Sequence, residues 1–206
     1  MKKYSLYLFD FDLTLFDTTD SLIEAYKQVL KKYGKNTNRT YEEFIGFLGL
    51  SLKRFMEHEH IDKEHTAELL SIFHDNASSE EVIKATKLYP DTKDCIDYLI
   101  KNKIKFGIVT GAHFDRVKMV FDYNKLPFFK MVCCITNESY KNPKPDGEPI
   151  TMALKTTGYE NKKGEVLYIG DAEQDLLCAK NAGVDCVLVN RENKNKDISS
   201  LMDLFK

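Results

Sequence analysis

The sequence predicts an α/β protein, with a Rossmann-like, doubly wound parallel sheet as its core and an inserted all-helical cap domain. Short, almost uninterrupted apolar runs recur along the chain and alternate with amphipathic segments, which is the pattern of strands covered by helices on both faces. In addition, roughly ninety residues separate the first run from the second, far more than one crossover helix needs. A second domain is therefore expected between them.

The strands of the core are expected where the apolar runs lie, at 6–9, 106–109, 131–135, 166–169 and 186–189. Helical segments follow at 92–101, 113–123, 148–157 and 173–181. Asp91 can cap the first of these helices after Pro90, and Gly158 and Gly183 stand where helices should end. Alternating strands and helices imply right-handed crossovers in an open sheet.

The inserted segment carries helical signals and no strand of comparable strength. Ser21 with Glu24, and Thr40 with Glu43, have the spacing of capping boxes, and Gly34 can end the first helix. Two further helices are expected at 51–60 and 62–74. We therefore place the helical cap domain at 18–88 and the catalytic core at 1–17 and 89–206.

Composition excludes several classes of protein. The 206 residues include 30 Lys and Arg against 32 Asp and Glu, so there is no general basic field to hold nucleic acid. No apolar stretch approaches the ~20 residues of a membrane span, and we expect a cytoplasmic protein that does not bind membranes. The five cysteines are odd in number and lack a C-x-x-C pair, which indicates reduced and mostly buried thiols. We expect a monomer or a weak homodimer.

Carboxylates follow the predicted strands at the edge where an open parallel sheet binds its ligands. Asp10 and Asp12 come directly after the first run, and the two-residue period of a strand points them the same way. Asp171 follows the fourth run, with Asp175 one helical turn later. The same edge receives Thr110 after the second run and Lys144 from a turn-rich segment, so an acidic site is expected here.

Four carboxylates beside one lysine leave excess negative charge that a low-dielectric site would penalise. A divalent cation would neutralise it. Because these acids offer only oxygen ligands, with no His or Cys beside them, Mg²⁺ is favoured over Zn²⁺. An anionic substrate held by the metal, Lys144 and backbone N–H groups would suit phosphoryl transfer, which depends on stabilising charge.

Four ordered motifs now resemble those of the haloacid dehalogenase superfamily. They are the run Asp10-Phe11-Asp12-Leu13-Thr14-Leu15, then Thr110, then Lys144-Pro145, and finally Gly170-Asp171 with Asp175. Each stands at or near a predicted strand end, and together they span almost the whole chain. The helical insertion resembles the cap of the branch that contains phosphoglycolate phosphatases and phosphoglucomutase-like enzymes.

The resemblance implies a Mg²⁺-dependent phosphatase that acts on a small phosphomonoester in two steps. Asp10 would attack phosphorus and form an aspartyl-phosphate, and Asp12 would serve as general acid and then general base. Thr110 and Gly111 would hold phosphoryl oxygens, with Lys144 neutralising charge. The metal ligands would be the Asp10 carboxylate, the Asp12 carbonyl and Asp171, with Asp175 as a ligand or a supporting residue.

The sequence gives weaker evidence for the residues that contact the substrate than for the catalytic residues. The run 49–52 resembles the substrate loop of the cap, which makes Gly49 a candidate, and Arg54, like its neighbour Lys53, has the charge to bind a distal anionic group. His113 lies near the expected crevice. The cluster 57–60, rich in His and Glu, is interpreted as a solvated helix face rather than a metal site.

Some positions depart from the family pattern. Leu13 replaces the usual Gly, so we expect the backbone there to avoid positive φ. Gly111 replaces a frequent Asn, which leaves only a backbone donor. Leu22 stands where related phosphosugar mutases carry His, which disfavours a mutase.

Other activities stay open as alternatives. A dehalogenase would need no metal, and a phospho-accepting signalling module would carry its acceptor on a middle strand and lack a cap. The leaving group is also open, because phosphoglycolate, pyrophosphate, sugar phosphates and nucleoside monophosphates all suit a cap of this size.

Overall fold

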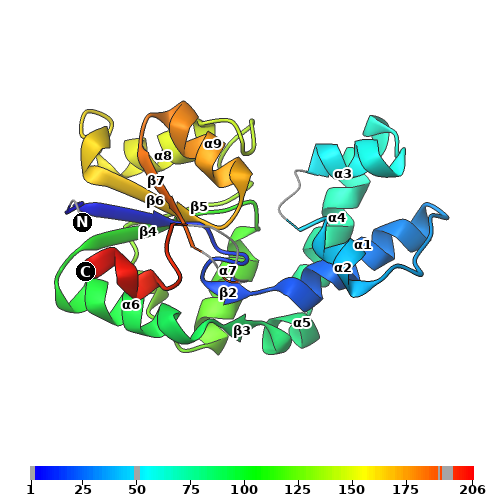
Figure 1. Ribbon diagram of the computed structural model, residues 1–206, viewed down its shortest axis with the longest axis horizontal. Coiled ribbons are helices and arrows are strands. Elements are labelled where there is room, and N and C mark those ends of the chain that lie inside the picture. Colours follow the sequence, from blue (N-terminus) through cyan, green and yellow to red (C-terminus); the bar gives the residue numbers. More distant parts are fainter. Residues whose placement is uncertain (1–2, 49–51, 190, 192–196) are drawn as a thin grey trace. The chain divides into compact units, whose positions relative to one another are not determined.

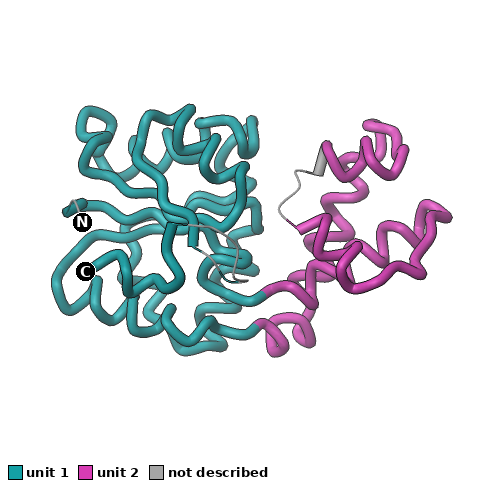
Figure 2. Tube along the Cα trace, viewed as in Figure 1, with its two compact units in different colours: residues 1–17, 87–206 teal, residues 18–86 magenta. Residues whose placement is uncertain are grey.

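The structure is a computed structural model that describes residues 3–48, 52–189, 191 and 197–206 (Figure 1). The chain divides into two compact units, one formed by 1–17 and 87–206 and the other by 18–86 (Figure 2). We call them the sheet unit and the helical unit.

A parallel five-stranded sheet forms the centre of the sheet unit, with the strand order β5-β4-β1-β6-β7. Because β1 lies in the middle, both of its edges are paired and all four of its side chains are buried. The strands are β1 (Leu6–Phe9), β4 (Lys105–Val109), β5 (Cys133–Ile135), β6 (Val166–Gly170) and β7 (Asp185–Leu188).

Helices cover both faces of this sheet, which confirms the predicted Rossmann-like class. In Figure 1, α8 and α9 lie on one face, and α6 with the C-terminal η4 lies on the other. The helices are α6 (Pro90–Lys101), α7 (Phe114–Tyr123), α8 (Glu148–Thr157) and α9 (Glu173–Ala182), with 3₁₀ turns η2 (Phe128–Lys130), η3 (Lys163–Glu165) and η4 (Leu201–Phe205).

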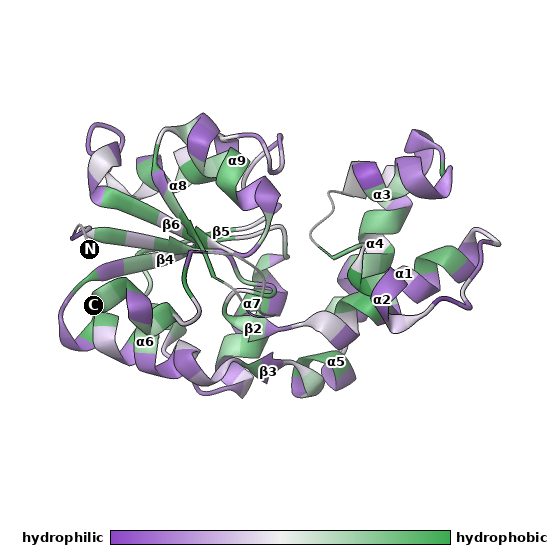
Figure 3. Cartoon of the chain, in the orientation of Figure 1, coloured by the Kyte–Doolittle hydropathy of each residue, from purple (hydrophilic) through white to green (hydrophobic). Residues whose placement is uncertain are grey.

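The apolar runs are strands because both of their faces are buried. Side chains of β1 and β6, among them Leu6, Leu8, Val166 and Tyr168, pack with Ile150 and other residues of α8 and α9 in one hydrophobic cluster. Figure 3 shows hydrophobic residues along the central strands and mixed faces on the covering helices. This packing fixes the carboxyl ends of the strands, where the candidate site lies.

Every regular element that the structure describes within 18–86 is a helix. Aromatic side chains dominate their shared core, including Tyr26, Phe44, Phe47 and Phe55. The helices are α1 (Thr19–Lys32), α2 (Tyr41–Ile45), α3 (Leu52–Glu59), η1 (Lys63–His65), α4 (Thr66–Ala77) and α5 (Glu80–Ala85). The capping box predicted at Thr40 and Glu43 is present in full.

Two predicted helix starts are wrong. α1 begins at Thr19 with Thr18 as its N-cap, and Ser21 instead donates its hydroxyl proton to the Thr18 carbonyl. α6 begins with Pro90 at its first position, so Asp91 lies inside the helix. Its carboxylate accepts hydrogen bonds from Arg191 and from Ser200 in the C-terminal segment, a tertiary use that local sequence does not reveal.

Three short elements were not predicted from the sequence. β2 (Phe16–Asp17) and β3 (Lys87–Leu88) pair antiparallel at the two chain crossings between the units. The helix α5 follows Ser79, whose side chain accepts the Val82 amide proton. All three are too short to give a sustained periodic pattern.

The thiols behave as predicted, because all five cysteines are free, three of them are buried and the other two are partly buried. In the part of the chain that the structure describes, no helix combines the length and apolar character needed to cross a membrane.

Candidate active site

The carboxyl ends of three neighbouring strands bring the predicted polar residues to one edge of the sheet. The Asp10 amide continues the ladder of β1 by donating to the Ile169 carbonyl at 2.8 Å, and the Thr110 amide donates to Ile135 at 2.9 Å. Asp171 follows β6 directly. The parallel pairing of β4, β1 and β6 therefore sets the spacing of these residues.

Lys144 forms the centre of the charged group. Its Nζ lies 2.8 Å from Asp10 Oδ1 and 2.8 Å from Asp175 Oδ1, and its side chain is only 8% exposed. Burial lowers the pKa of Lys144, but the carboxylates of Asp10 and Asp175 outweigh burial and raise it. The lysine is therefore a fixed positive charge between two acids.

Asp10 lies in a strongly negative environment despite this lysine. Burial raises the pKa of its carboxyl well above the usual range, Lys144 lowers it, and the charges of Asp175 and Asp171 raise it again. Carboxylate oxygens of Asp10, Asp171 and Asp175 all lie within 4.8 Å of one another. Three carboxylate oxygens gathered in this way could together hold a cation.

Asp175 is fully buried, and hydrogen bonds occupy both of its oxygens. Oδ1 accepts from Lys144 and, at 3.1 Å, from the Tyr168 hydroxyl. Oδ2 accepts from the backbone amides of Asp171 at 3.2 Å and Ala172 at 3.1 Å. A carboxylate has about four acceptor positions, and all are used here. Asp175 thus anchors both Lys144 and the loop that presents Asp171.

The position of the Asp175 side chain requires glycine at position 170. A Cβ on Gly170 would lie 2.4 Å from the Asp175 Cγ, a distance that real side chains do not reach. The requirement is for space rather than for a special backbone conformation, since Gly170 is not among the positive-φ residues. Sequence reasoning identified the Gly170-Asp171 pair but not this steric reason.

Thr110 and Gly111 lie at the end of β4. Thr110 is buried, its Oγ1 accepts the Ala112 amide proton at 3.0 Å, and its carbonyl accepts from Tyr140 at 3.0 Å. Gly111 is exposed, and a Cβ there would meet nothing within 4 Å. The end of β4 therefore offers a fixed hydroxyl beside an open backbone position.

Asp12 points to a partner that the sequence did not reveal. Arg116 on α7 donates from Nη1 to Asp12 Oδ2 at 2.9 Å and from Nη2 to Asp12 Oδ1 at 2.7 Å. The group of carboxylates that could hold a cation at the sheet edge contains Asp10, Asp171 and Asp175, and the Asp12 carboxylate is not part of it.

The prediction for Leu13 is wrong, because its φ is +56°. The chain reverses directly after Asp12: the Leu13 amide donates to the Phe16 carbonyl at 2.8 Å, and the Leu15 amide donates to Phe11 at 3.1 Å. This tight loop imposes the left-handed conformation even on a leucine. It also places the Thr14 hydroxyl 3.1 Å from Asp171 Oδ1.

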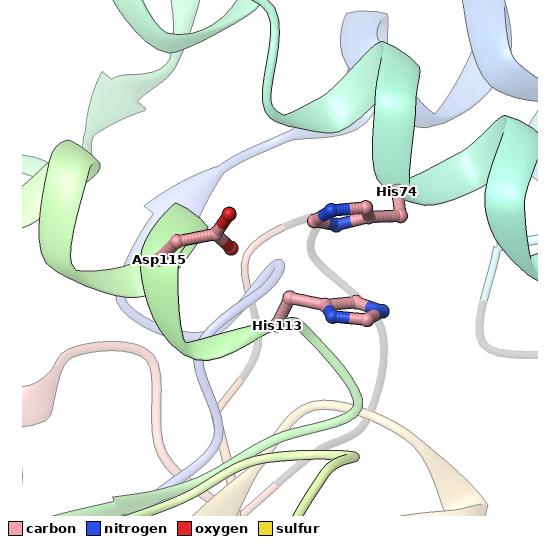
Figure 4. Close-up of side chains that lie close together, drawn as sticks. All are labelled: His74, His113 and Asp115. Atoms are coloured by element: carbon pink, nitrogen blue, oxygen red, sulfur yellow. The ribbon is translucent and has the colours of Figure 1, made fainter.

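The predicted substrate contacts were His113, Arg54 and Gly49. His113 directly precedes α7 and lies 3.6 Å from Glu138, Asp115 belongs to the first turn of α7, and His74 belongs to α4 of the helical unit; Figure 4 draws these three side chains. Arg54 is an exposed residue of α3, and Gly49 lies outside the described residues.

The interpretation of 57–60 as a solvated face is wrong at one position. Glu59 is buried, with its Oε2 lying 2.6 Å from Arg39 Nη2 and its Oε1 lying 2.7 Å from His58 Nδ1. Its neighbours Glu57, His58 and His60 are exposed. The end of α3 therefore carries a buried ion pair rather than a uniformly solvated surface.

Comparisons with known proteins identify the family of this chain. Residues 7–189 match the model of the haloacid dehalogenase-like hydrolase family. A pyrophosphatase PpaX from Anoxybacillus flavithermus is 34% identical over 179 residues, covering 85% of this chain and 79% of the relative. A phosphoglycolate phosphatase from Pseudomonas aeruginosa is 27% identical, covering 88% of this chain and 67% of the relative.

A crystal structure of a haloacid dehalogenase-like hydrolase from Bacteroides fragilis superposes with a TM-score of 0.86 at 28% identity, covering 98% of this chain and all of the other. The match to the family extends over the sheet unit and the helical unit alike. The family resemblance expected from the four motifs is thereby confirmed. This chain is an enzyme of the haloacid dehalogenase-like hydrolase family.

Proposed function

We propose that this chain is a Mg²⁺-dependent phosphatase that hydrolyses a small phosphomonoester through an aspartyl-phosphate on Asp10. The observation that carries the proposal is the acidic group at the sheet edge, in which Asp10 is held by Lys144 and lies within 4.8 Å of Asp171 and Asp175. The relatives named as phosphatases support the reaction class.

The donors present fit a magnesium ion. The group offers carboxylate oxygens without His or Cys, and Lys144 contacts two of its three acids, Asp10 and Asp175. Asp10 and Asp171 would hold the ion, with the Asp12 backbone carbonyl as a third ligand. When bound, Mg²⁺ would neutralise charge on the phosphoryl group.

Asp175 would position the residues of this site by hydrogen bonds rather than bind the ion itself. Its four hydrogen bonds fix Lys144 and the backbone at Asp171, so that their positions do not depend on the metal. Such supporting residues determine the orientation of ligands and are as sensitive to substitution as the ligands themselves.

Asp10 would be the nucleophile. Lys144 holds Oδ1, which leaves the second carboxylate oxygen to attack phosphorus. A bond forms between that oxygen and phosphorus while the bond to the leaving group breaks, and Asp12 donates a proton to the departing oxygen. Thr110 and the Gly111 amide would hold the phosphoryl oxygens. Fixed donors at that position stabilise the charge of the transition state.

The second step would regenerate the enzyme. Asp12, now a carboxylate, takes a proton from a water molecule, and the resulting hydroxide oxygen bonds to phosphorus. The bond between phosphorus and Asp10 breaks, and inorganic phosphate leaves. The same residue therefore acts first as acid and then as base.

The helical unit would act as the cap that selects the substrate, with Arg54, His113 and Gly49 as candidates for contact with the leaving group. Pyrophosphate and phosphoglycolate are the first substrates to test, because the relatives described above are named for them.

The test is a screen of pyrophosphate, phosphoglycolate, sugar phosphates and nucleoside monophosphates, measuring kcat/KM for each with Mg²⁺ and after EDTA treatment. We expect turnover of at least one compound that EDTA abolishes and Mg²⁺ restores. A dehalogenase would keep its activity without metal, and a mutase would require a bisphosphate. A stable acyl-phosphate without turnover would indicate a signalling module. Any of these results would overturn the proposal.

A further inference from the structure

A buried arginine lies beside Asp12, and the reaction proposed above gives it no role. Arg116 belongs to the first turn of α7, is separated from Asp12 by 104 residues of sequence, and has a side chain only 4% exposed. A buried guanidinium requires a compensating partner, since desolvation strongly disfavours an isolated charge. Asp12 is that partner.

The contact fixes the orientation of the carboxylate as well as its position. Two nitrogens of the guanidinium fork each donate to a different oxygen of Asp12, at 2.9 Å and 2.7 Å. The guanidinium carbon also lies 5.1 Å from the centre of the Phe11 ring. A two-point contact from a planar group held against an aromatic face prevents rotation of the carboxylate, which a single-point contact from a lysine would allow.

The rest of the guanidinium is arranged around this contact. The Arg116 Nε is buried and has no hydrogen-bond partner among the described residues. An arginine placed only to stabilise the fold would be expected to use all of its buried donors. Here the donors that are satisfied are the pair that faces Asp12.

The Asp12 side chain keeps one side accessible. It is 23% exposed, in contrast to the buried arginine. The fork therefore leaves part of the Asp12 side chain accessible to a reacting group.

We propose that Arg116 is a positioning residue for the acid–base step, which it controls by holding the Asp12 carboxylate in one orientation. This inference rests on the proposed function, in which Asp12 donates a proton to the leaving group. Proton transfer depends steeply on alignment, so a carboxyl group free to rotate would transfer its proton more slowly, even though the guanidinium by itself favours the ionised form. Loss of the fork should therefore slow the reaction most where the leaving group needs that proton most.

The experiment compares phenyl phosphate with p-nitrophenyl phosphate, two esters of similar size. Phenolate is the poorer leaving group and needs protonation more than p-nitrophenolate does. Arg116→Lys keeps the charge but loses the fork, and Arg116→Met loses both. We expect each variant to lower kcat about tenfold or more on phenyl phosphate and less than about threefold on p-nitrophenyl phosphate, with KM little changed.

Two further measurements separate positioning from folding. Guanidinium chloride at low concentration should partly restore kcat of Arg116→Met on phenyl phosphate, whereas sodium chloride at equal ionic strength should not. In an Asp12→Asn background, Arg116→Met should add no further leaving-group-dependent loss. Arg39→Lys is the matched control, because it makes the same substitution at the buried Arg39–Glu59 pair of the helical unit. Any effect of this variant on kcat should be the same for phenyl phosphate and for p-nitrophenyl phosphate.

Equal slowing of both esters by Arg116→Lys, with wild-type turnover intact, would overturn the inference and leave the proposed function standing. A wild-type enzyme that hydrolyses neither ester, nor any phosphate in the screen above, would overturn the proposed function and the inference with it. If Arg116→Met does not fold, the comparison is made with Arg116→Lys alone.

Discussion

Each unit of the molecule buries acidic side chains beside basic ones, but the two arrangements differ in their balance of charge. In the helical unit, Glu59 is a single acid contacted by Arg39 and His58. In the sheet unit, Asp10 and Asp175 share Lys144, and Asp171 lies close to both. An acid that basic side chains contact on both oxygens needs no further partner, whereas three clustered acids would suit a bound cation. Clustering of acids therefore identifies a candidate site better than burial alone.

The largest expected effect is on turnover. Asp10→Asn removes the proposed nucleophile and should lower kcat by about 10³-fold or more on every substrate found in the screen. Asp185→Asn is the control, since Asp185 lies at the opposite end of the sheet, at the start of β7. It should retain wild-type kcat. Activity in Asp10→Asn close to that of Asp185→Asn would exclude Asp10 as the nucleophile.

The same change, from carboxylate to amide, should also have opposite effects on thermal stability in the two units. In EDTA, Asp10→Asn relieves excess negative charge and should raise Tm by about 2–4 °C, whereas Glu59→Gln leaves Arg39 without its charge partner and should lower it by at least as much. Thermal unfolding of both variants measures this. Shifts of the same sign would show that the two buried groups are alike and that the clustering of acids has no consequence.

The next effect is on metal affinity. Asp171→Asn should raise the Mg²⁺ concentration for half-maximal activity by about 10–100-fold, because it removes a ligand oxygen and its charge. Titration of activity with Mg²⁺ gives this number. Glu59→Gln should leave the Mg²⁺ titration unchanged, and an equal change in both variants would place the ion elsewhere.

A smaller effect is expected from steric displacement. Gly170→Ala would force its Cβ against Asp175, so we expect a loss of stability of about 1–3 kcal/mol together with a lower kcat. Gly111→Ala provides the matched control for stability, because its Cβ enters open space. Denaturant unfolding should separate the two variants, and equal stabilities would mean that Asp175 can move without cost.

The smallest effect is the pH dependence of the helical unit. Burial raises the pKa of Glu59, but hydrogen bonds from Arg39 and His58 outweigh burial and lower it below its ordinary value of 4.5. An acid with a lowered folded-state pKa adds stability above its unfolded pKa, and that contribution is lost as the pH falls through the folded-state pKa.

Wild-type protein should therefore lose more unfolding free energy than Glu59→Gln between about pH 5 and about pH 3. Denaturant titrations of both proteins at the two pH values measure the difference. The remaining acids titrate in both proteins and cancel. Identical losses would remove the assigned role of Glu59.

The sequence predicted the sheet well because its strands are buried on both faces and so read as apolar runs, as at 6–9 and 166–169. The same logic singled out Asp10 and Asp12, since two acids directly after a buried run destabilise the fold unless a metal or ligand is present. Short elements failed, because β2, β3 and α5 offer too few residues for periodicity.

The contact of Arg116 with Asp12 and the backbone conformation of Leu13 were not predicted, for different reasons. The Arg116 partner is 104 residues away, so no local pattern identifies the pair, although a charge on the helix face shared with Val117 and Val120 was a usable signal. Leucine disfavours positive φ, so the sequence predicted an ordinary backbone conformation at Leu13. The hydrogen bonds of the surrounding loop impose positive φ there instead.

The most direct test of the central claim is a crystal structure of the protein with Mg²⁺ and beryllium fluoride, which mimics a phosphoryl group bound to a carboxylate. We expect beryllium to bond to an Asp10 carboxylate oxygen, Mg²⁺ to lie between Asp10 and Asp171, and Lys144 to remain in contact with Asp10. Beryllium fluoride bound to another residue, or Mg²⁺ bound away from these two acids, would show that the nucleophile or the metal site is assigned wrongly.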